Sequence, residues 1–330
     1  MTKLLEVKNL TICYKTDLGV VNALNDVSIS VEEGKTFGLV GETGAGKTTL
    51  AKGIMRLTPI PPGDVKSGQI LYNGKDLMKL EEAEIRKIRG KHISMIFQDP
   101  MTSLNPVMTV GDQIAEVVIN HENISVKDAY VKTNEMLELV EIPSERSSEY
   151  PHQFSGGMKQ RVIIAMALAC NPKLLIADEP TTALDVTIQA QVLEMMKELK
   201  NKFNTSVLLI THDLGVVAQN CDDVAVIYAG EVVESGTVRD IFKNMKHPYT
   251  EGLFASIPNI AEDVRRLKPI DGLMPDPTSL PKGCKFHTRC KYAQDVCRNE
   301  HPKMTLVNDR HIVRCFIQEN LVSRRDIDEK

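Results

Sequence analysis

The sequence has no apolar run long enough to cross a membrane as a helix, which takes about 18 residues or more. Its longest run, Val162–Cys170, is half that length. The first residues read MTKLLEVKNLTICY, and Glu6 and Lys8 interrupt them, so the apolar core of a signal peptide is missing. We therefore expect a cytosolic protein rather than a secreted or membrane-spanning one.

The chain also has no surplus of one charge, no internal repeat and no low-complexity tract. Lys plus Arg number 40 and Asp plus Glu 44, a net charge of −4. This balance excludes the basic footprint of proteins that bind nucleic acids, and unaided adhesion to an anionic membrane. With 42% apolar and 25% charged residues, the chain is neither disordered, collagen-like nor a coiled-coil rod. Its 330 residues suit about two domains, or one large domain with an appendage.

The apolar pattern predicts an α/β fold. Two alternating runs, 4–13 and 22–31, indicate antiparallel N-terminal strands. Later strands alternate with helices, which predicts a mostly parallel sheet with helices on its faces. The strands expected are 36–40, 69–72 before the turn at Asn73-Gly74, 92–97, 173–177, 207–210 and 224–228.

Two segments depart from this alternation. From about 110 to 169 the period is helical, with a Ser125-x-x-Asp128 cap, so we expect a helical subdomain at about 100–170. Beyond about residue 256 prolines accumulate and the periodicity fades. We expect a first domain over 1–255 and a separate, loop-rich C-terminal extension over 256–330.

A phosphate-binding loop follows the strand 36–40 and precedes a helical stretch. It matches G-x-x-x-x-G-K-[ST] and comprises Gly41, Glu42, Thr43, Gly44, Ala45, Gly46, Lys47, Thr48 and Thr49. Its glycines let backbone N–H groups turn toward phosphate oxygens, and the helix N-terminus adds partial positive charge. Lys47 is expected to reach the outer phosphates and Thr48 to ligate Mg²⁺.

A pair of carboxylates ends the apolar strand Leu174–Ala177. Asp178 suits the Mg²⁺ shell, and Glu179, one residue on, can face an attacking water as general base. A strand that ends in a solvated acidic pair is the alternative. Ser155, Gly156 and Gly157 precede an apolar helix and could form a second anion site, although taken alone they are better explained by a plain helix cap.

The set of motifs, in this order, resembles the ATP-binding-cassette (ABC) ATPases over residues 4–255. The resemblance implies a P-loop NTPase fold with a mixed sheet, ATP and Mg²⁺ as ligands, and a role for each matching residue. Tyr14 would stack on adenine, Gln98 would contact Mg²⁺, and His212 would hydrogen-bond the γ-phosphate. Ser155-Gly156-Gly157 would be the signature motif, in which Phe154 and Met158 replace the usual outer Leu and Gln. Ala183-Leu184-Asp185 would be the loop that crosses between paired domains, placing Asp185 at the nucleotide.

One branch of this family fits further. The segments FQDPMTSLNP (97–106) and HPYT (247–250), with the long C-terminal extension, resemble the ATPase subunits of bacterial dipeptide and oligopeptide importers. The resemblance implies ATP hydrolysis that powers peptide import. The implied partners are a second ATPase subunit, identical or paralogous, two permease subunits and an extracellular solute-binding protein. Nucleic acid is not among them, and the place implied is peripheral, at the cytoplasmic face of the membrane.

Other functions remain open at this point. Nickel or another solute could be the cargo, because the ATPase does not select it. A cassette ATPase of DNA repair would insert long coiled coils or zinc modules between the P-loop and the signature, yet Ser155 follows Gly46 by only 109 residues. A soluble P-loop kinase would not carry Gln98, the Ser-Gly-Gly motif and His212.

Four of the seven cysteines, Cys284, Cys290, Cys297 and Cys315, crowd into the extension. In a reducing compartment such a group suggests metal before disulfides. The intervals of five, six and seventeen residues are wider than the C-x₂₋₄-C pairs of structural zinc sites. A [4Fe–4S] cluster tolerates wider loops and occurs in this branch of the family, so we expect one, with zinc or free thiols as alternatives. Cys13, Cys170 and Cys221 have apolar neighbours and are expected to pack in the core.

Overall fold

The computed structural model describes residues 2–182, 184–256 and 270–319. They form two compact units that interleave along the chain. The first unit takes residues 1–6, 30–37 and 71–211, and the second takes 7–29, 38–70 and 212–330. Residue 183 and the segment 257–269, which carries two of the prolines noted above, lie outside the described residues.

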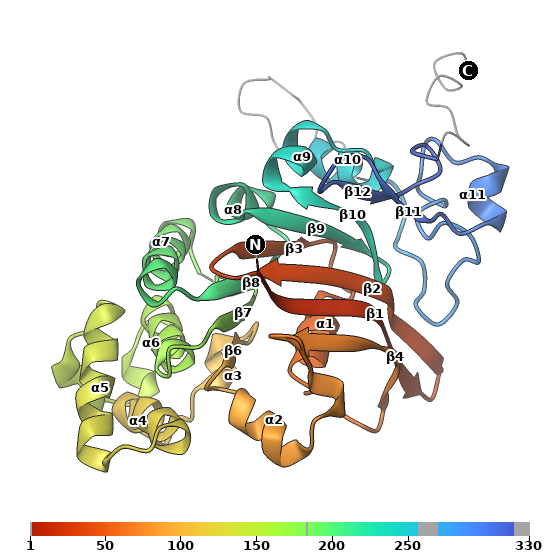
Figure 1. The fold of residues 1–330 in the computed structure, drawn as a ribbon. Helices are drawn as coiled ribbons and strands as arrows, with labels where there is room; N and C mark the ends of the chain where they lie inside the picture. The colour runs from red at the N-terminus through yellow and green to blue at the C-terminus, as the bar shows by residue number, and fades with distance from the viewer. Residues whose placement is uncertain (1, 183, 257–269, 320–330) are drawn as a thin grey trace. The chain divides into compact units, whose positions relative to one another are not determined.

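The strands are β1 (Lys3–Thr16), β2 (Gly19–Glu32), β3 (Thr36–Val40), β4 (Gly63–Tyr72), β5 (Lys75–Asp76), β6 (Ile93–Ile96), β7 (Leu174–Asp178), β8 (Ser206–Thr211), β9 (Asp223–Tyr228), β10 (Glu231–Thr237), β11 (Met304–Leu306) and β12 (Ile312–Arg314) (Figure 1). The helices are α1 (Lys47–Ile54), α2 (Glu82–Ile88), α3 (Pro100–Ser103), α4 (Val110–His121), α5 (Val126–Leu139), α6 (Gly156–Leu168), α7 (Val186–Phe203), α8 (Leu214–Asn220), α9 (Val238–Lys243), α10 (Pro248–Ala255) and α11 (Asp295–Asn299).

The first unit is built on parallel strands in the order β3-β8-β7-β6, to which β3 contributes its first two residues. Every residue of β6, β7 and β8 is buried, as expected of parallel strands covered on both faces. In register, Ile96 lies beside Ala177, and Asp178 beside Ile210. The carboxyl ends of these neighbouring strands therefore lie at one edge of the sheet.

Helices form most of residues 110–168 in the first unit. Helices α4, α5 and α6 pack against one another, shown in yellow to green in Figure 1, and α6 also packs on β6 and α7. The Ser125 side chain accepts a hydrogen bond from the Asp128 N–H at 3.2 Å, so the sequence-predicted cap does begin α5. Such a cap satisfies one of the N–H groups that a helix start leaves without an intrahelical acceptor.

The N-terminal sheet has the order β2-β1-β4-β5. Only two residues connect β1 to β2, so these strands are antiparallel, as predicted. A second tight turn connects β4 to β5. Asn73 and Gly74 both have positive φ, 48° and 77°, and the flanking Tyr72 and Lys75 pair. This is the hairpin that the Asn-Gly dipeptide predicts.

In the second unit the strands run β3-β9-β10-β12-β11, with β3 contributing its last three residues. Residues 304–314 differ from the loop-rich extension expected of them, because β12 pairs antiparallel with β10 and β11 pairs with β12. Strands of three residues are too short to produce a readable alternation, which is why the sequence pattern missed them.

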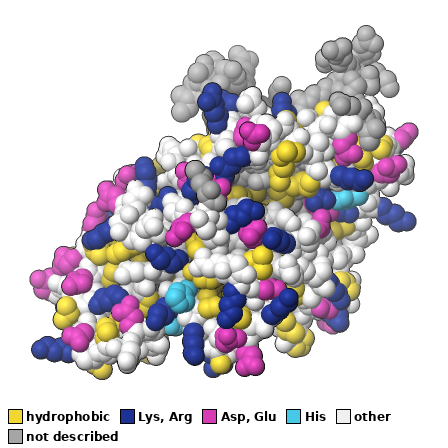
Figure 2. Space-filling model, viewed as in Figure 1, with side chains coloured by type: hydrophobic (Ala, Val, Ile, Leu, Met, Phe, Trp, Pro, Cys, Tyr) yellow, Lys and Arg dark blue, Asp and Glu magenta, His cyan; other side chains and the backbone are white. Residues whose placement is uncertain are grey.

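The surface carries both signs of charge. On the face shown in Figure 2, Lys and Arg side chains are interspersed with Asp and Glu. This mixture agrees with the balanced composition and is unlike the one-sided basic stripe of a nucleic-acid-binding surface. Among the described residues, no helix combines the length and apolar character needed to cross a membrane.

A buried carboxylate connects the C-terminal strands to α10. Glu234 on β10 is fully buried and accepts hydrogen bonds from the backbone N–H of Lys246 at 2.6 Å and of His247 at 3.0 Å. His311 Nε2 lies 2.7 Å from Oε1 of Glu234, the same oxygen that accepts from Lys246. Although burial acts to raise it, hydrogen bonds from His311 and these N–H groups lower the pKa of Glu234 overall.

We predict that Glu234→Ala destabilises the protein by about 3 kcal/mol, because the donors around it stay buried without an acceptor. Chemical denaturation at pH 7 measures this, with the exposed Glu194→Ala on α7 as control. Since the folded-state pKa is lowered, the stability that ionised Glu234 contributes is fully present above 4.5, the ordinary pKa of glutamate. It is lost as the pH falls from there through the lower folded-state pKa. A Glu234→Ala effect no larger than that of Glu194→Ala would contradict the prediction.

Candidate functional site

The predicted phosphate loop connects β3 to α1 in the second unit. Gly46 precedes α1 with a φ of 108°, in the region that favours glycine. A Cβ atom at this position would lie 2.6 Å from the carbonyl oxygen of Ala23. No other residue fits here, so the sharp turn that presents the backbone N–H groups at the start of α1 depends on this glycine.

The Lys47 side chain lies inside that loop. It is 5% exposed, and its ammonium donates to the carbonyl oxygens of Gly41 at 2.8 Å and Glu42 at 3.1 Å. Thr48 and Thr49 follow in the first turn of α1 and are half-buried. An ammonium group beside a helix N-terminus is an arrangement that binds anions.

Two further predicted residues lie in this unit. Tyr14 on β1 is half-buried, and its ring lies beside Gly63, where a Cβ would come within 3.3 Å of Cε1. His212 is exposed and directly follows β8. The next residue, Asp213, accepts hydrogen bonds from the N–H groups of Gly215 and Val216 and so caps α8.

The first unit brings a second group of predicted residues together. Gln98 follows β6, and Asp178 and Glu179 end the neighbouring β7. Asp178 is 1% exposed, and Glu179 is half-buried. The Gln98 amide donates to Glu179 Oε2 at 3.2 Å, so these two side chains, 81 residues apart in sequence, meet at the strand ends.

The Glu179 carboxylate is fixed from a second side. The Thr182 hydroxyl donates to the same Oε2 atom at 2.9 Å, a contact that sequence reasoning did not anticipate. The Glu179 backbone has a φ of 50°, rare for a residue with a side chain, and its N–H donates to the Ile210 carbonyl. Strained positions of this kind concentrate at functional sites.

The predicted signature motif begins α6. The Ser155 side chain accepts a hydrogen bond from the Met158 N–H at 3.4 Å. The N-terminus of α7 packs against Gly157. A Cβ atom on Gly157 would come within 2.6 Å of the Ile188 side chain, so the contact is close. Asp185 caps that helix by accepting from the Ile188 N–H at 3.0 Å, whereas Ala183 lies outside the described residues.

Arg146 explains how the two unusual residues of the motif are accommodated. Its guanidinium lies 4.5 Å from the centre of the Phe154 ring and donates to the Met158 sulfur at 3.5 Å. Glu149 holds the arginine through Nε and Nη2 at 2.6–3.1 Å. Arg146 thus contacts both residues that flank Ser-Gly-Gly. The only sequence signal for this contact is that Arg146 lies nine residues before Ser155.

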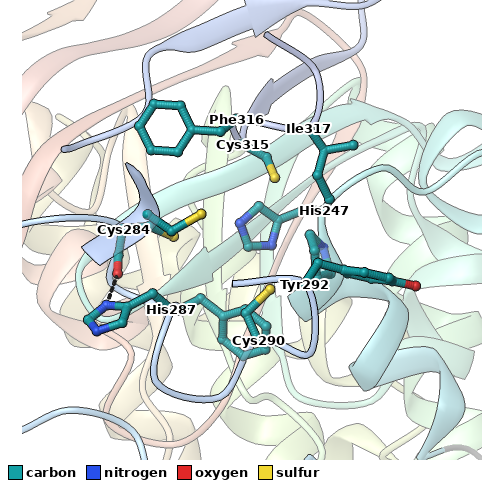
Figure 3. A pocket seen from close by; sticks show the side chains of 11 residues that line it. His247, Cys284, His287, Cys290, Tyr292, Cys315, Phe316 and Ile317 are labelled. Carbon is teal, nitrogen blue, oxygen red and sulfur yellow. Dashed lines mark hydrogen bonds between the residues drawn. The ribbon is translucent and has the colours of Figure 1, made fainter. Parts of the chain in front are cut away.

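The four clustered cysteines line one pocket of the second unit, which encloses about 320 Å³ of empty space, part of it open to solvent. We call this the cysteine pocket; its lining includes His247, Cys284, His287, Cys290, Cys297 and Cys315 (Figure 3). All seven cysteines are free. The four cysteines therefore share one pocket, although Cys297 and Cys315 come from well-separated segments.

The pocket is apolar, and this sets the state of its titratable groups. Burial raises the pKa of Cys284 and Cys315 to about 12 and that of Cys290 to about 11, so these thiols stay protonated at neutral pH. Burial lowers the pKa of His247 to about 4. Its Nδ1 accepts from the Tyr249 N–H, so the neutral ring carries its proton on Nε2.

A preformed ion site is not found. Within the part of the chain that the structure describes, no three or more Cys, His, Asp or Glu side chains are gathered closely enough to hold a metal ion. The cysteines share a pocket without converging on one point. The metal centre expected from the sequence is thus not shown by this geometry.

Comparisons with known proteins decide the family. Residues 24–182 match the family model described as ABC transporter, and residues 233–297 match that of the oligopeptide/dipeptide transporter C-terminal region. The oligopeptide transport ATP-binding protein OppD of Bacillus subtilis is 54% identical over 320 residues, which cover 96% of this chain and 89% of that protein. The chain belongs to the ATP-binding proteins of ABC transporters, in the oligopeptide and dipeptide branch.

Other matches agree with this assignment of the ABC protein. The dipeptide transport ATP-binding protein DppD of the same species is 52% identical, over 97% of this chain and 96% of that protein. A solved dimeric ATP-binding cassette in a post-hydrolysis state, bound to ADP and Pi, has a TM-score of 0.64 and 28% identity. The match covers 71% of this chain and 99% of the solved cassette. The ABC protein thus has the cassette fold and is an ATPase.

We predict that Lys47→Ala weakens ATP binding by about tenfold or more, because it removes the buried ammonium beside the N-terminus of α1, where the phosphates are expected to bind. Isothermal titration calorimetry with Mg²⁺ and ATP measures the affinity. Lys52→Ala, in the last turn of the same helix, is the matched control. Equal affinity in the Lys47→Ala variant and the wild type would count against the phosphate-loop assignment.

Proposed function

We propose that this ABC protein hydrolyses ATP to power the import of dipeptides or oligopeptides through a membrane permease. The observation that carries the proposal is the match that extends past the cassette into the C-terminal region. Cassettes of many transporters share the nucleotide motifs, whereas this region is described as that of oligopeptide and dipeptide transporters. Nickel import and DNA repair are not favoured by these comparisons.

The site residues take roles that follow from their chemistry. The loop N–H groups and Lys47 bind the phosphates, and Tyr14 stacks on the adenine. Thr48, Gln98 and Asp178 are the oxygen-bearing side chains that would hold Mg²⁺, which neutralises charge on the phosphates. Glu179, which Gln98 and Thr182 orient, accepts the proton of the attacking water, and His212 hydrogen-bonds the γ-phosphate.

The remaining motifs act between paired subunits. We assign Ser155, Gly156, Gly157 and Asp185 to the nucleotide that the partner ATPase binds, with each ATP held between one phosphate loop and the opposite signature motif. A paralogous partner is preferred to an identical one. Two permease subunits and an extracellular solute-binding protein complete the importer. The ATPase then lies peripherally at the cytoplasmic face of the membrane, with residues 1–255 as the cassette and 256–330 as its extension.

We also propose a [4Fe–4S] cluster in the cysteine pocket. What supports it is that four free thiols line one apolar cavity, so the donor set fits a group larger than a single ion. Three of these thiols, Cys284, Cys290 and Cys315, need a positively charged centre to give up their protons, because burial raises their pKa values to about 11 to 12. The cluster would add metal ligation to the apolar packing that Phe286 and Phe316 provide in this region.

We predict that Glu179→Gln lowers ATP turnover by about a hundredfold or more while nucleotide binding persists, because an amide cannot accept the proton. Steady-state phosphate release and equilibrium ATP binding measure the two effects, and the variant should trap an ATP-bound dimer. Glu194→Gln, an exposed carboxylate on α7, is the control. Turnover near the wild-type rate would remove Glu179 from this role.

For the cysteine pocket, we predict that protein purified without oxygen is brown and holds about four iron and four sulfide per chain. Cys290→Ser should lower both contents, whereas Cys221→Ser, outside the pocket, should not. Metal and sulfide analysis distinguishes the alternatives. One zinc per chain without sulfide would favour the zinc alternative, and a metal-free protein would leave only thiols.

A further inference from the structure

The phosphate loop is attached to the C-terminal extension through one of its own residues. Both carboxylate oxygens of Glu42 accept hydrogen bonds from Arg289 Nη1, at 3.1 and 2.9 Å. The two residues are 247 positions apart, and both belong to the second unit. Glu42 is 30% exposed at its side chain, whereas Arg289 is only 5% exposed. The arginine is therefore the fixed member of this ion pair.

Arg289 is fixed because each nitrogen of its guanidinium has an acceptor. Nε donates to the carbonyl of Asp271 at 3.0 Å, and Nη2 donates to the carbonyl of Ile270 at 3.2 Å. Nη1 also lies 3.4 Å from the Tyr228 hydroxyl. A planar guanidinium held at three sides cannot swing away, so it presents a stationary positive charge to the loop.

The Glu42 backbone is held by the same part of the molecule. Its N–H donates to the Tyr249 hydroxyl at 2.9 Å. Tyr249 is fully buried. The centre of its ring lies 4.5 Å from the ring centre of Tyr228 and 5.4 Å from that of Phe286. Phe286 and Arg289 both lie in the short loop between Cys284 and Cys290. One packed group thus controls both the side chain and the backbone of Glu42.

The ion pair places a positive charge beside the carboxylate of the phosphate loop. A loop that receives the phosphates of ATP contains a carboxylate, whose negative charge opposes binding of a polyanion. The adjacent Lys47 ammonium donates to the backbone carbonyls of Gly41 and Glu42, and in the proposed site its charge serves the phosphates. Arg289 supplies the charge that offsets Glu42 and, by holding its carboxylate, also holds the loop in one conformation.

We propose that Arg289 is a positioning residue for ATP binding: through Glu42 it neutralises and fixes the phosphate loop, so that the C-terminal extension sets the affinity of the cassette for nucleotide. The inference rests on the proposed ATPase function. It adds a role for the extension in nucleotide binding, which the cassette motifs, all located before residue 256, do not contain.

The test measures Mg²⁺-ATP affinity of the full chain by calorimetry, together with KM and kcat. Arg289→Gln should weaken binding by about tenfold and raise KM more than it lowers kcat, since the carboxylate is left uncompensated. Arg289→Lys should lie between this variant and the wild type. The defect of Arg289→Gln should shrink at high salt, which screens the exposed part of the charge. Arg298→Gln, an exposed arginine of the same extension, is the matched control.

The double variant Glu42→Gln with Arg289→Gln separates charge from mere structural support. It should recover most of the lost affinity, because neither charge remains. Thermal unfolding of each variant shows whether it is folded. Wild-type affinity in Arg289→Gln, or an equal loss in the single and double variants, would overturn the proposal. If the wild-type chain itself binds no ATP, the proposed function fails instead, so the two failures are distinct.

Discussion

The candidate catalytic residues lie at, or within two residues of, the carboxyl end of strands that are buried along their whole length. The phosphate loop follows β3, Gln98 lies two residues after β6, Asp178 ends β7 with Glu179 next to it, and His212 directly follows β8. A strand without exposed residues is anchored on both faces, so the polar residues at its end are held to within small displacements. The chemistry of this ATPase depends on that anchoring, to which contacts within the loops add, such as those of Lys47 with Gly41 and Glu42 and of Thr182 with Glu179.

The sequence was sufficient to predict a structural element where neighbouring residues themselves cause that element to form. An apolar run followed by G-x-x-x-x-G-K-T indicates the strand, the loop and the helix together, and a Ser or an Asn-Gly pair fixes a cap or a turn through its own atoms. Contacts between distant residues gave no such signal. No residue near Glu42 in the sequence points to Arg289. The sequence has two adjacent threonines after Glu179, and only the structure shows that the hydroxyl of Thr182 is the one that contacts it.

The signature motif shows how a departure from a family pattern can be absorbed by packing. Phe154 offers an aromatic face to a guanidinium, which a leucine cannot, and Met158 offers a polarizable sulfur. Arg146 lies between them and is neutralised by Glu149. The two changes from the usual motif and Arg146 thus form one interaction. They should therefore be considered as a unit when the motif is compared between importers.

The pairing of β12 with β10 has a practical consequence. A chain shortened to the cassette alone would remove β12 and leave Glu234 and Ser235 of β10 on an open sheet edge, where N–H and C=O groups invite pairing with another molecule. Such a fragment would expose this edge even if every nucleotide motif remained intact. For this importer ATPase, β11 and β12 cover the edge of the sheet, and their loss would affect solubility before it affects catalysis.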